Sequence, residues 1–218
     1  MKPAIYIVLF VATVLALSGC KLNRGIAGSG VRKTEKRDLK PFTAVDLDGA
    51  YQVNVTCQAS TAFEIDADDN ILPLIKTEVH DGILFIKSVQ EFHASKLPAV
   101  RIALPDLETL TSHGAGQIRI ANVNNSQLGL DSDGAATIDA AGTSKFVTIG
   151  ATGAGMIDAT NLHAEKVRVS VSGAANIDVY ATDQLDVDIA GVSRVSYSGN
   201  PKTVNKHVTG VGSVGPKD

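Results

Sequence analysis

Three aspartates at nearly constant spacing are the residues of this chain best placed for chemistry. Asp139, Asp158 and Asp178 each follow directly after an isoleucine. If they lie on neighbouring parallel strands, about 4.8 Å apart, their carboxylates are close enough to share a proton or a cation. Such a column could bind calcium or supply the paired acids of a polysaccharide hydrolase. The alternative interpretation is that each strand needs a polar outward residue and that Asp suits the turn that follows.

A second candidate for chemistry is Cys20, as a site of covalent modification. Lys2 is followed by an apolar run over residues 4–17 and then by Leu17-Ser18-Gly19-Cys20, which looks like the lipobox of a bacterial lipoprotein signal. The run is too short for a typical membrane span and suits a signal-peptide core. We therefore predict a signal peptide over residues 1–20, with lipidation of Cys20 after cleavage. An ordinary cleaved signal or an uncleaved anchor helix is the alternative.

The residues after Cys20 differ in charge from the rest of the chain. Lys21, rather than Asp, follows Cys20, and by the sorting rule of enteric-type lipoproteins this favours the outer membrane in a Gram-negative host. Residues 21–40 hold seven Lys or Arg against two acidic residues, whereas residues 41–218 hold 12 basic and 21 acidic residues. We expect a basic, flexible tether near anionic lipid, although the same charges could simply solvate a linker. An acidic body outside the cytoplasm argues against nucleic acid as a partner.

Other chemistry is sparse in the sequence. The five histidines are scattered, with no spacing that would place two of them on one face for a metal. Neither a nucleophile elbow nor a phosphate loop is present, and Tyr180 and Tyr197 are the few aromatic candidates for a sugar platform in the repeat region. We expect no enzyme activity, metal or cofactor. A carbohydrate-active enzyme or a cation-dependent glycan binder, using the three aspartates, remains the alternative.

The elements that must position the aspartates repeat with the same period. Glycines return every 18 to 20 residues, at Gly114, Gly134, Gly153, Gly173, Gly191 and Gly210. Four residues after each glycine stands an aliphatic residue, namely Ile118, Ile138, Ile157, Ile177, Val195 and Val214. Apolar residues also alternate with polar or small ones before each glycine, which is typical of a strand with one buried face. Self-similarity at such a period indicates a solenoid.

The predicted fold is therefore all-β, a β-helix-like stack of short parallel strands with coils of about 19 residues. Glycine at each corner would permit a left-handed or crowded backbone. The same register occurs around Gly49, so we expect the stack to begin there. Residues 41–218 would form a single domain that is repetitive over 105–214. With aromatic residues at 5% and no Trp, its core must consist of Val, Ile, Leu and Ala.

The segment 56–104 is less regular. It contains strand-like runs at 62–65, 82–86 and 100–104, and residues 71–75 suggest a helical turn or a loop. We expect wider coils here that cap one end of the stack, because terminal units must cover the open core. Cys57 continues the inward series of its strand and has no disulfide partner once Cys20 is lipidated. The alternative for Cys57 is a reactive thiol or intermolecular pairing.

Several motifs are similar to those of the auto-transporter adhesin family with a head GIN domain. They are the runs at 41–50, 68–70, 77–86, 197–202 and 208–214. The resemblance implies a β-helical envelope protein, often a lipoprotein, and it carries over no catalytic residue. We expect a lipid-anchored, noncatalytic adhesin or structural module of the cell envelope, with envelope polysaccharide or a cell-surface ligand as partner. The sequence indicates no oligomeric state.

Overall fold

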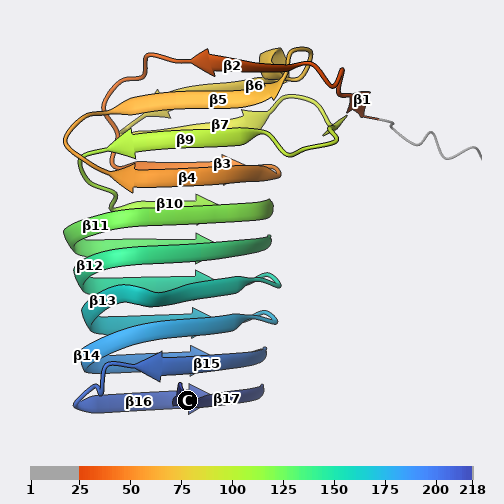
Figure 1. Ribbon diagram of the computed structural model, residues 1–218. Coiled ribbons are helices and arrows are strands. Elements are labelled where there is room, and N and C mark those ends of the chain that lie inside the picture. The colour runs from red at the N-terminus through yellow and green to blue at the C-terminus, as the bar shows by residue number, and fades with distance from the viewer. Residues whose placement is uncertain (1–24, 218) are drawn as a thin grey trace, which may run out of the picture.

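The computed structural model describes residues 25–217, which form a β-solenoid of about five turns (Figure 1). The predicted signal peptide over residues 1–20 and the predicted lipidation site, Cys20, lie outside the described residues. Within residues 25–217 no helix is both long and apolar enough to cross a membrane. The predicted all-β stack of parallel coils is confirmed.

Each coil contributes to two walls that face one another across the core. Four long strands run from one wall into the other: β11 (Ala115–Ser132), β12 (Ala135–Ala151), β13 (Met156–Val171) and β14 (Asn176–Ile189). The front wall consists of the first halves of these strands together with β4 (Tyr51–Cys57), β9 (Ala99–Leu104), β15 (Val192–Ser198) and β17 (Val211–Pro216). The back wall consists of their second halves together with β3 (Ala44–Asp48), β10 (Thr109–Ser112) and β16 (Thr203–Val208).

Strands β11 to β14 are longer than the short strands that the repeat suggests. They hold 14 to 18 residues because the pairing continues around the bend between the walls. Only small register shifts interrupt it, for example between Ile120 and Val123 and between Ala159 and His163. The bend is therefore made of bulged strand rather than of a separate loop.

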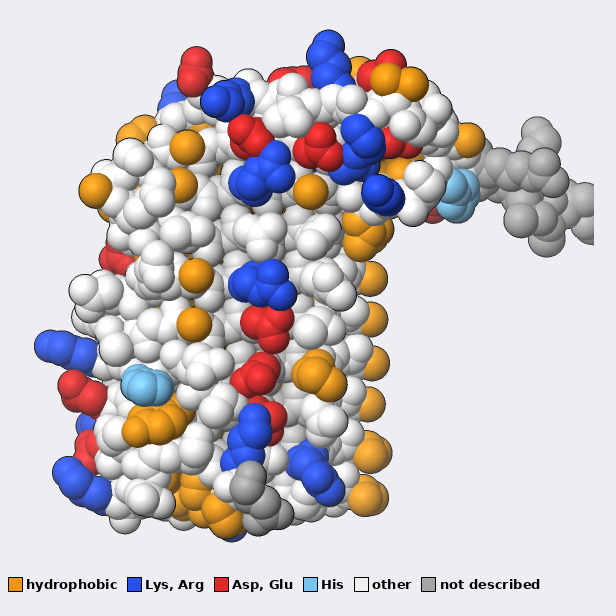
Figure 2. Space-filling model, in the orientation of Figure 1, with side chains coloured by type: hydrophobic (Ala, Val, Ile, Leu, Met, Phe, Trp, Pro, Cys, Tyr) orange, Lys and Arg blue, Asp and Glu red, His pale blue; other side chains and the backbone are white. Residues whose placement is uncertain are grey.

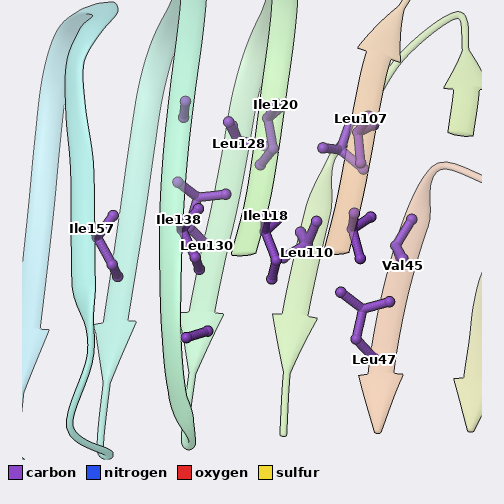
Figure 3. Packing of buried hydrophobic residues seen from close by; sticks show 14 of the residues in the cluster. Val45, Leu47, Leu107, Leu110, Ile118, Ile120, Leu128, Leu130, Ile138 and Ile157 are labelled. Atoms are coloured by element: carbon purple, nitrogen blue, oxygen red, sulfur yellow. The ribbon is translucent and has the colours of Figure 1, made fainter. Parts of the chain in front are cut away.

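The core is a set of aliphatic columns between the two walls. On the front wall Ile118, Ile138 and Ile157 pair in register on successive coils and are at most 3% exposed. Figure 3 shows their side chains on the inner side of the strands, opposite Leu110 and Leu130 of the back wall. No single coil could bury these side chains, so the coils stabilise one another by stacking.

The corner glycines are required by close backbone approach. A β-carbon on Gly134 would overlap the carbonyl oxygen of Gly114, and one on Gly153 would overlap that of Gly134. The same relationship joins each corner glycine to its equivalent one coil earlier, back to Gly49. Among these residues only Gly49 has a positive φ, of 133°. Crowding between backbones of adjacent coils, and not a left-handed backbone, therefore explains why glycine recurs at the corners. The predicted first copy at Gly49 is confirmed.

The N-terminal end of the stack is closed by a cap. Its elements are β1 (Ile26–Ala27), β2 (Arg32–Lys36), β5 (Ala62–Asp68), η1 (Leu72–Leu74), β6 (Ile75–His80), β7 (Ile83–Ser88) and β8 (Phe92–His93). The wider coils expected here are instead partly antiparallel, because β5 runs against β9 and β6 runs against β7. The latter two strands are joined by Asp81-Gly82, both with positive φ, which is the preferred chemistry of a tight hairpin turn.

The flexible tether expected over residues 21–40 is corrected by the structure for residues 26–36. Strand β1 pairs with β8, and β2 adds an antiparallel edge strand to β5. Arg32 Nε donates to Asp66 Oδ1 at 2.8 Å, and Thr34 donates to the same carboxylate at 2.9 Å. Polar and charged contacts thus hold a segment that has little apolar patterning of its own.

Cys57 stands at the end of β4. Its side chain is half-buried and packs against the core, as its place in the strand predicts. Burial raises the pKa of the thiol above its ordinary value. The thiol is therefore protonated at neutral pH, which disfavours nucleophilic chemistry.

Candidate functional site on the front wall

The three candidate aspartates form a continuous column on the outer face of the front wall. Asp139 pairs in register with Asp158, and Asp158 pairs with Asp178. All three side chains are partly exposed. Figure 2 shows a row of acidic side chains along the middle of this wall, with basic side chains above and below it. The structure thus brings together the residues that the spacing placed on adjacent coils.

Basic residues of the chain itself close both ends of this column. Arg119 pairs in register with Asp139, and its guanidinium lies 4.0 Å from the carboxylate. At the other end Lys217 Nζ lies 2.7 Å from Asp178 Oδ2 and donates to Thr160 Oγ1 at 2.9 Å. The hydrogen bond with Asp178 raises the pKa of Lys217. Two of the three carboxylates in the column therefore have a basic partner within the protein.

The middle carboxylate is satisfied by its own turn. Burial acts to raise the pKa of Asp158, but hydrogen bonds from Thr160 and the charge of Lys217 hold it below its ordinary value. The Thr160 amide donates to Asp158 Oδ1 at 3.0 Å. Across residues 25–217 no group of three or more His, Cys, Asp or Glu side chains is arranged to hold a metal ion. The three carboxylates are thus held by partners within the protein, Asp139 and Asp178 by basic side chains and Asp158 by its own turn.

An aromatic pair lies on the same wall, near the bend. The rings of His163 and Tyr180 stack with their centroids 4.2 Å apart and their planes 25° apart. A β-carbon on Gly199 would lie only 2.9 Å from Tyr180 Cε1, so glycine there leaves room for the ring. Tyr197, the other expected platform, is half-buried against the core. The sequence did not reveal the pair, because a bulge brings together two residues 17 apart instead of 19 or 20.

A second polar cluster joins three coils at the glycine corner. His113 Nδ1 lies 2.6 Å from Asp133 Oδ2, and its Nε2 lies 3.4 Å from Asp46 Oδ2. The hydrogen bond with Asp133 and the charge of Asp46 raise the pKa of His113, against a smaller effect of burial. The 20-residue separation of His113 and Asp133 equals one repeat and was a usable signal. Asp46 lies on the adjacent strand β3 but 67 residues away in the sequence, a separation that does not match the repeat and gave no signal.

Small apolar side chains form the edge between the two clusters. Figure 2 shows a column of hydrophobic side chains along the right-hand edge of the molecule. The residues directly after the corner glycines are small or apolar and form the ridge, namely Ala115, Ala135, Ala154, Ala174, Val192 and Val211. Val192 and Val211, at the far end, are 64% and 76% exposed. A surface hollow of about 760 Å³ lies beside the ridge. It is lined mainly by Ala, Gly, Ser and Val and offers few groups that could perform a reaction.

Solved structures of bacterial proteins have the same fold. A "putative adhesin" from Bacteroides fragilis is 24% identical, with a TM-score of 0.73 over 88% of this chain and 100% of that one. A "putative lipid binding protein" from Parabacteroides distasonis is 19% identical, with a TM-score of 0.52 over 88% of this chain and 99% of that one. At these identities the likeness establishes the architecture alone.

The sequence comparisons identify the family. A search of curated proteins finds no match. Residues 41–201 match the family described as "Putative auto-transporter adhesin, head GIN domain". This match spans most of the chain, including the corner glycines from Gly49 to Gly191 and the aspartate column. The chain therefore belongs to the auto-transporter adhesin family with a head GIN domain, a family of adhesin-like proteins of the cell surface or envelope.

Proposed function

We propose that the protein is a noncatalytic, lipid-anchored adhesion module of the bacterial cell envelope. Cys20 carries the lipid, the solenoid projects from it, and the front wall binds an extended partner such as an envelope polysaccharide or a cell-surface polymer. Membership of an adhesin family and the lipobox-like run ending at Cys20 support this proposal. In a Gram-negative host, Lys21 supports the outer membrane as the site of attachment.

The observation that carries the proposal is the repeated layout of the front wall. Its charged side chains stand in a column along the stack, in which Arg119 pairs with Asp139 and Lys217 pairs with Asp178. Coils about 4.8 Å apart present similar groups at regular intervals, which suits a partner with its own repeating units. The stacked rings of His163 and Tyr180 add a flat surface on which a sugar ring can lie.

The anchor is tested on the full chain expressed in a bacterial host. The wild type should incorporate a palmitate analogue and sediment with membranes, whereas Cys20→Ser should lose the label and the membrane association. Lys21→Asp, in an enteric host, should move the labelled protein from the outer to the inner membrane. An unlabelled wild type would overturn the lipid anchor.

Adhesion is tested with the chain lacking residues 1–20. This protein should bind whole cells, peptidoglycan, lipopolysaccharide or capsular polysaccharide in a pull-down assay. His163→Ala/Tyr180→Ala should weaken the binding, whereas Arg168→Ala/Asp186→Ala, on the opposite wall, should leave it unchanged. Failure of the wild type to bind any of these materials would remove the support for adhesion.

A further inference from the structure

The segment that follows the anchor is fixed to the cap almost from its first described residue. Ile26 N donates to Glu91 O at 2.9 Å, and Gly28 N donates to His93 O at 2.8 Å. Gly30 N donates to Asp68 Oδ2 at 3.1 Å, and this acceptor carboxylate belongs to a residue that is only 1% exposed. A β-carbon on Gly25 would lie 2.7 Å from the backbone of Glu91. The chain is therefore held against the cap from residue 25 onward.

This attachment limits the distance between the cap and a lipid on Cys20. The inference below rests on the proposed lipidation of Cys20. Five residue steps separate Cys20 from Gly25. Even fully extended, they reach about 18 Å, which is less than the thickness of the hydrocarbon core of a bilayer. Strand β1, where the described chain begins, lies at the side of the cap (Figure 1). With Cys20 lipidated, the cap surface next to this point, which we call the exit, must lie close to the membrane.

Exposed apolar side chains gather at this exit. We define the overhang as residues 88–98 together with the bound segment 25–31, and Figure 2 shows the cap projecting sideways at this point. Val89 and Leu97 are 58% and 43% exposed and line the same groove of about 650 Å³. Val31 is 61% exposed, and the next residue, Arg32, contacts the Lys96 carbonyl at 3.4 Å. Leaving the apolar surface of these valine and leucine side chains in water is unfavourable in free energy compared with burying it.

Basic residues accompany these apolar ones. On the overhang the exposed Lys96 offsets the exposed Glu91, and in the sequence between Cys20 and the cap Lys21 and Arg24 add two positive charges. Lys and Arg side chains next to a bilayer are attracted to anionic headgroups, while apolar side chains enter the boundary below them. The combination matches the interface of a membrane that carries negative charge.

We propose that the overhang docks on the bilayer that holds the anchor, with Val31, Val89 and Leu97 inserted at the headgroup level. The anchor makes this contact intramolecular, so a few side chains suffice where they could not bind a membrane alone. The docked cap then fixes the direction in which the solenoid and its front wall leave the surface.

Fluorescence can test the docking, because the chain contains no Trp. The lipidated protein carrying Val31→Trp is reconstituted into phosphatidylethanolamine and phosphatidylglycerol vesicles with brominated acyl chains. We expect a blue-shifted emission and strong quenching. Val211→Trp, at the opposite end of the stack, should keep the emission of an indole in water.

Matched double variants separate docking from anchoring. In the Val31→Trp protein, Val89→Asp/Leu97→Asp should abolish the quenching, and Val192→Asp/Val211→Asp, at more exposed but remote positions, should not. Protein that floats with the vesicles but shows unquenched Val31→Trp emission would overturn the docking and leave the anchor intact. Protein that lacks acyl chains by mass spectrometry and does not float would overturn both.

Discussion

The α-carbon of Gly134 faces the carbonyl oxygen of Gly114 so closely that no side chain can be placed between them. This relationship recurs at every glycine corner and sets the spacing of the coils there. Replacement must push two coils apart or break the backbone hydrogen bond from Ala135 N to Gly114 O, which measures 2.9 Å.

Gly134→Ala should therefore destabilise the stack by about 3 kcal/mol, at the upper end of what overpacking costs. Gly129→Ala is the matched control, since its β-carbon would meet only Thr109 and Thr148 Oγ1 at 3.4 Å. That variant should be neutral or slightly stabilising, because glycine is a poor strand residue. Urea unfolding followed by circular dichroism measures both, and equal stabilities would contradict the crowding.

The buried column predicts a second contrast between neighbours in sequence. Ile157 is 1% exposed and Met156 is 50% exposed. Ile157→Ala should cost about 2–5 kcal/mol of unfolding free energy, from lost burial and the cavity left behind. Met156→Ala should stay within about 0.5 kcal/mol of the wild type. A small effect of Ile157→Ala would mean that the coils can collapse to fill the space.

His113 predicts a dependence of stability on pH. Its folded-state pKa is raised above the ordinary 6.5 by Asp133 and Asp46, so the charged imidazolium is the form that stabilises the fold. This contribution is fully present below pH 6.5 and disappears as the pH rises through the raised folded-state pKa. His113→Gln should therefore lower the melting temperature in mildly acidic buffer and have little effect at alkaline pH.

Asp133→Asn is the partner variant for that test. It should reproduce most of the loss, and the double variant should add little to either single one, as expected for coupled residues. Because the histidine is 40% exposed, we expect a modest effect. Additive losses, or a loss of the same size at all pH values, would rule out the charge interaction.

The last described coil predicts that Lys206 limits self-association through the sheet edge. Lys206 takes the inward position that Val187 occupies one coil earlier, and its Nζ donates to Val214 O at 2.9 Å. An inward-pointing charge at an open sheet edge is a known defence against edge-to-edge pairing. Lys206→Val should increase self-association in sedimentation velocity, whereas Lys202→Val, on the outer surface, should not. Monomeric Lys206→Val would contradict this role.

The aspartate column predicts no stabilisation by calcium. Arg119 and Lys217 already pair with Asp139 and Asp178, so calcium at about 1 mM, the upper range for extracellular calcium modules, should leave the melting temperature unchanged. The melting temperature of the triple variant Asp139→Asn/Asp158→Asn/Asp178→Asn should likewise not change on addition of calcium. A calcium-induced rise in the wild type that this triple variant lacks would instead establish a cation site and revive cation-dependent glycan binding.

The sequence predicts the repetitive part of the fold well, because each buried or crowded position recurs. Ile138, Ile157 and Ile177 identify the inward face, and the corner glycines identify the edge. The cap is harder, since strand direction depends on turns that occur once. Only Asp81-Gly82 signals a reversal there, and β2, with four of its five residues exposed, resembles a charged linker.

In the candidate site, too, the residues that follow the repeat could be predicted and those that do not could not. The aspartates were found because they follow the repeat, and Lys217 was missed because it comes from the chain end and reaches back across coils. The stack of His163 on Tyr180 depends on a bulge that shifts the register locally. Side chains that meet through such irregularities leave no periodic trace in the sequence.

The equivalence of the glycine corners also has a consequence for how this family can vary. A segment cut out between two equivalent glycines is a complete coil, with its own share of both walls and matching surfaces above and below. Duplication or deletion of such a segment in the gene would lengthen or shorten the molecule by about 4.8 Å per coil without creating a new kind of contact. Relatives of different height can therefore arise while the cap and the last coil stay unchanged.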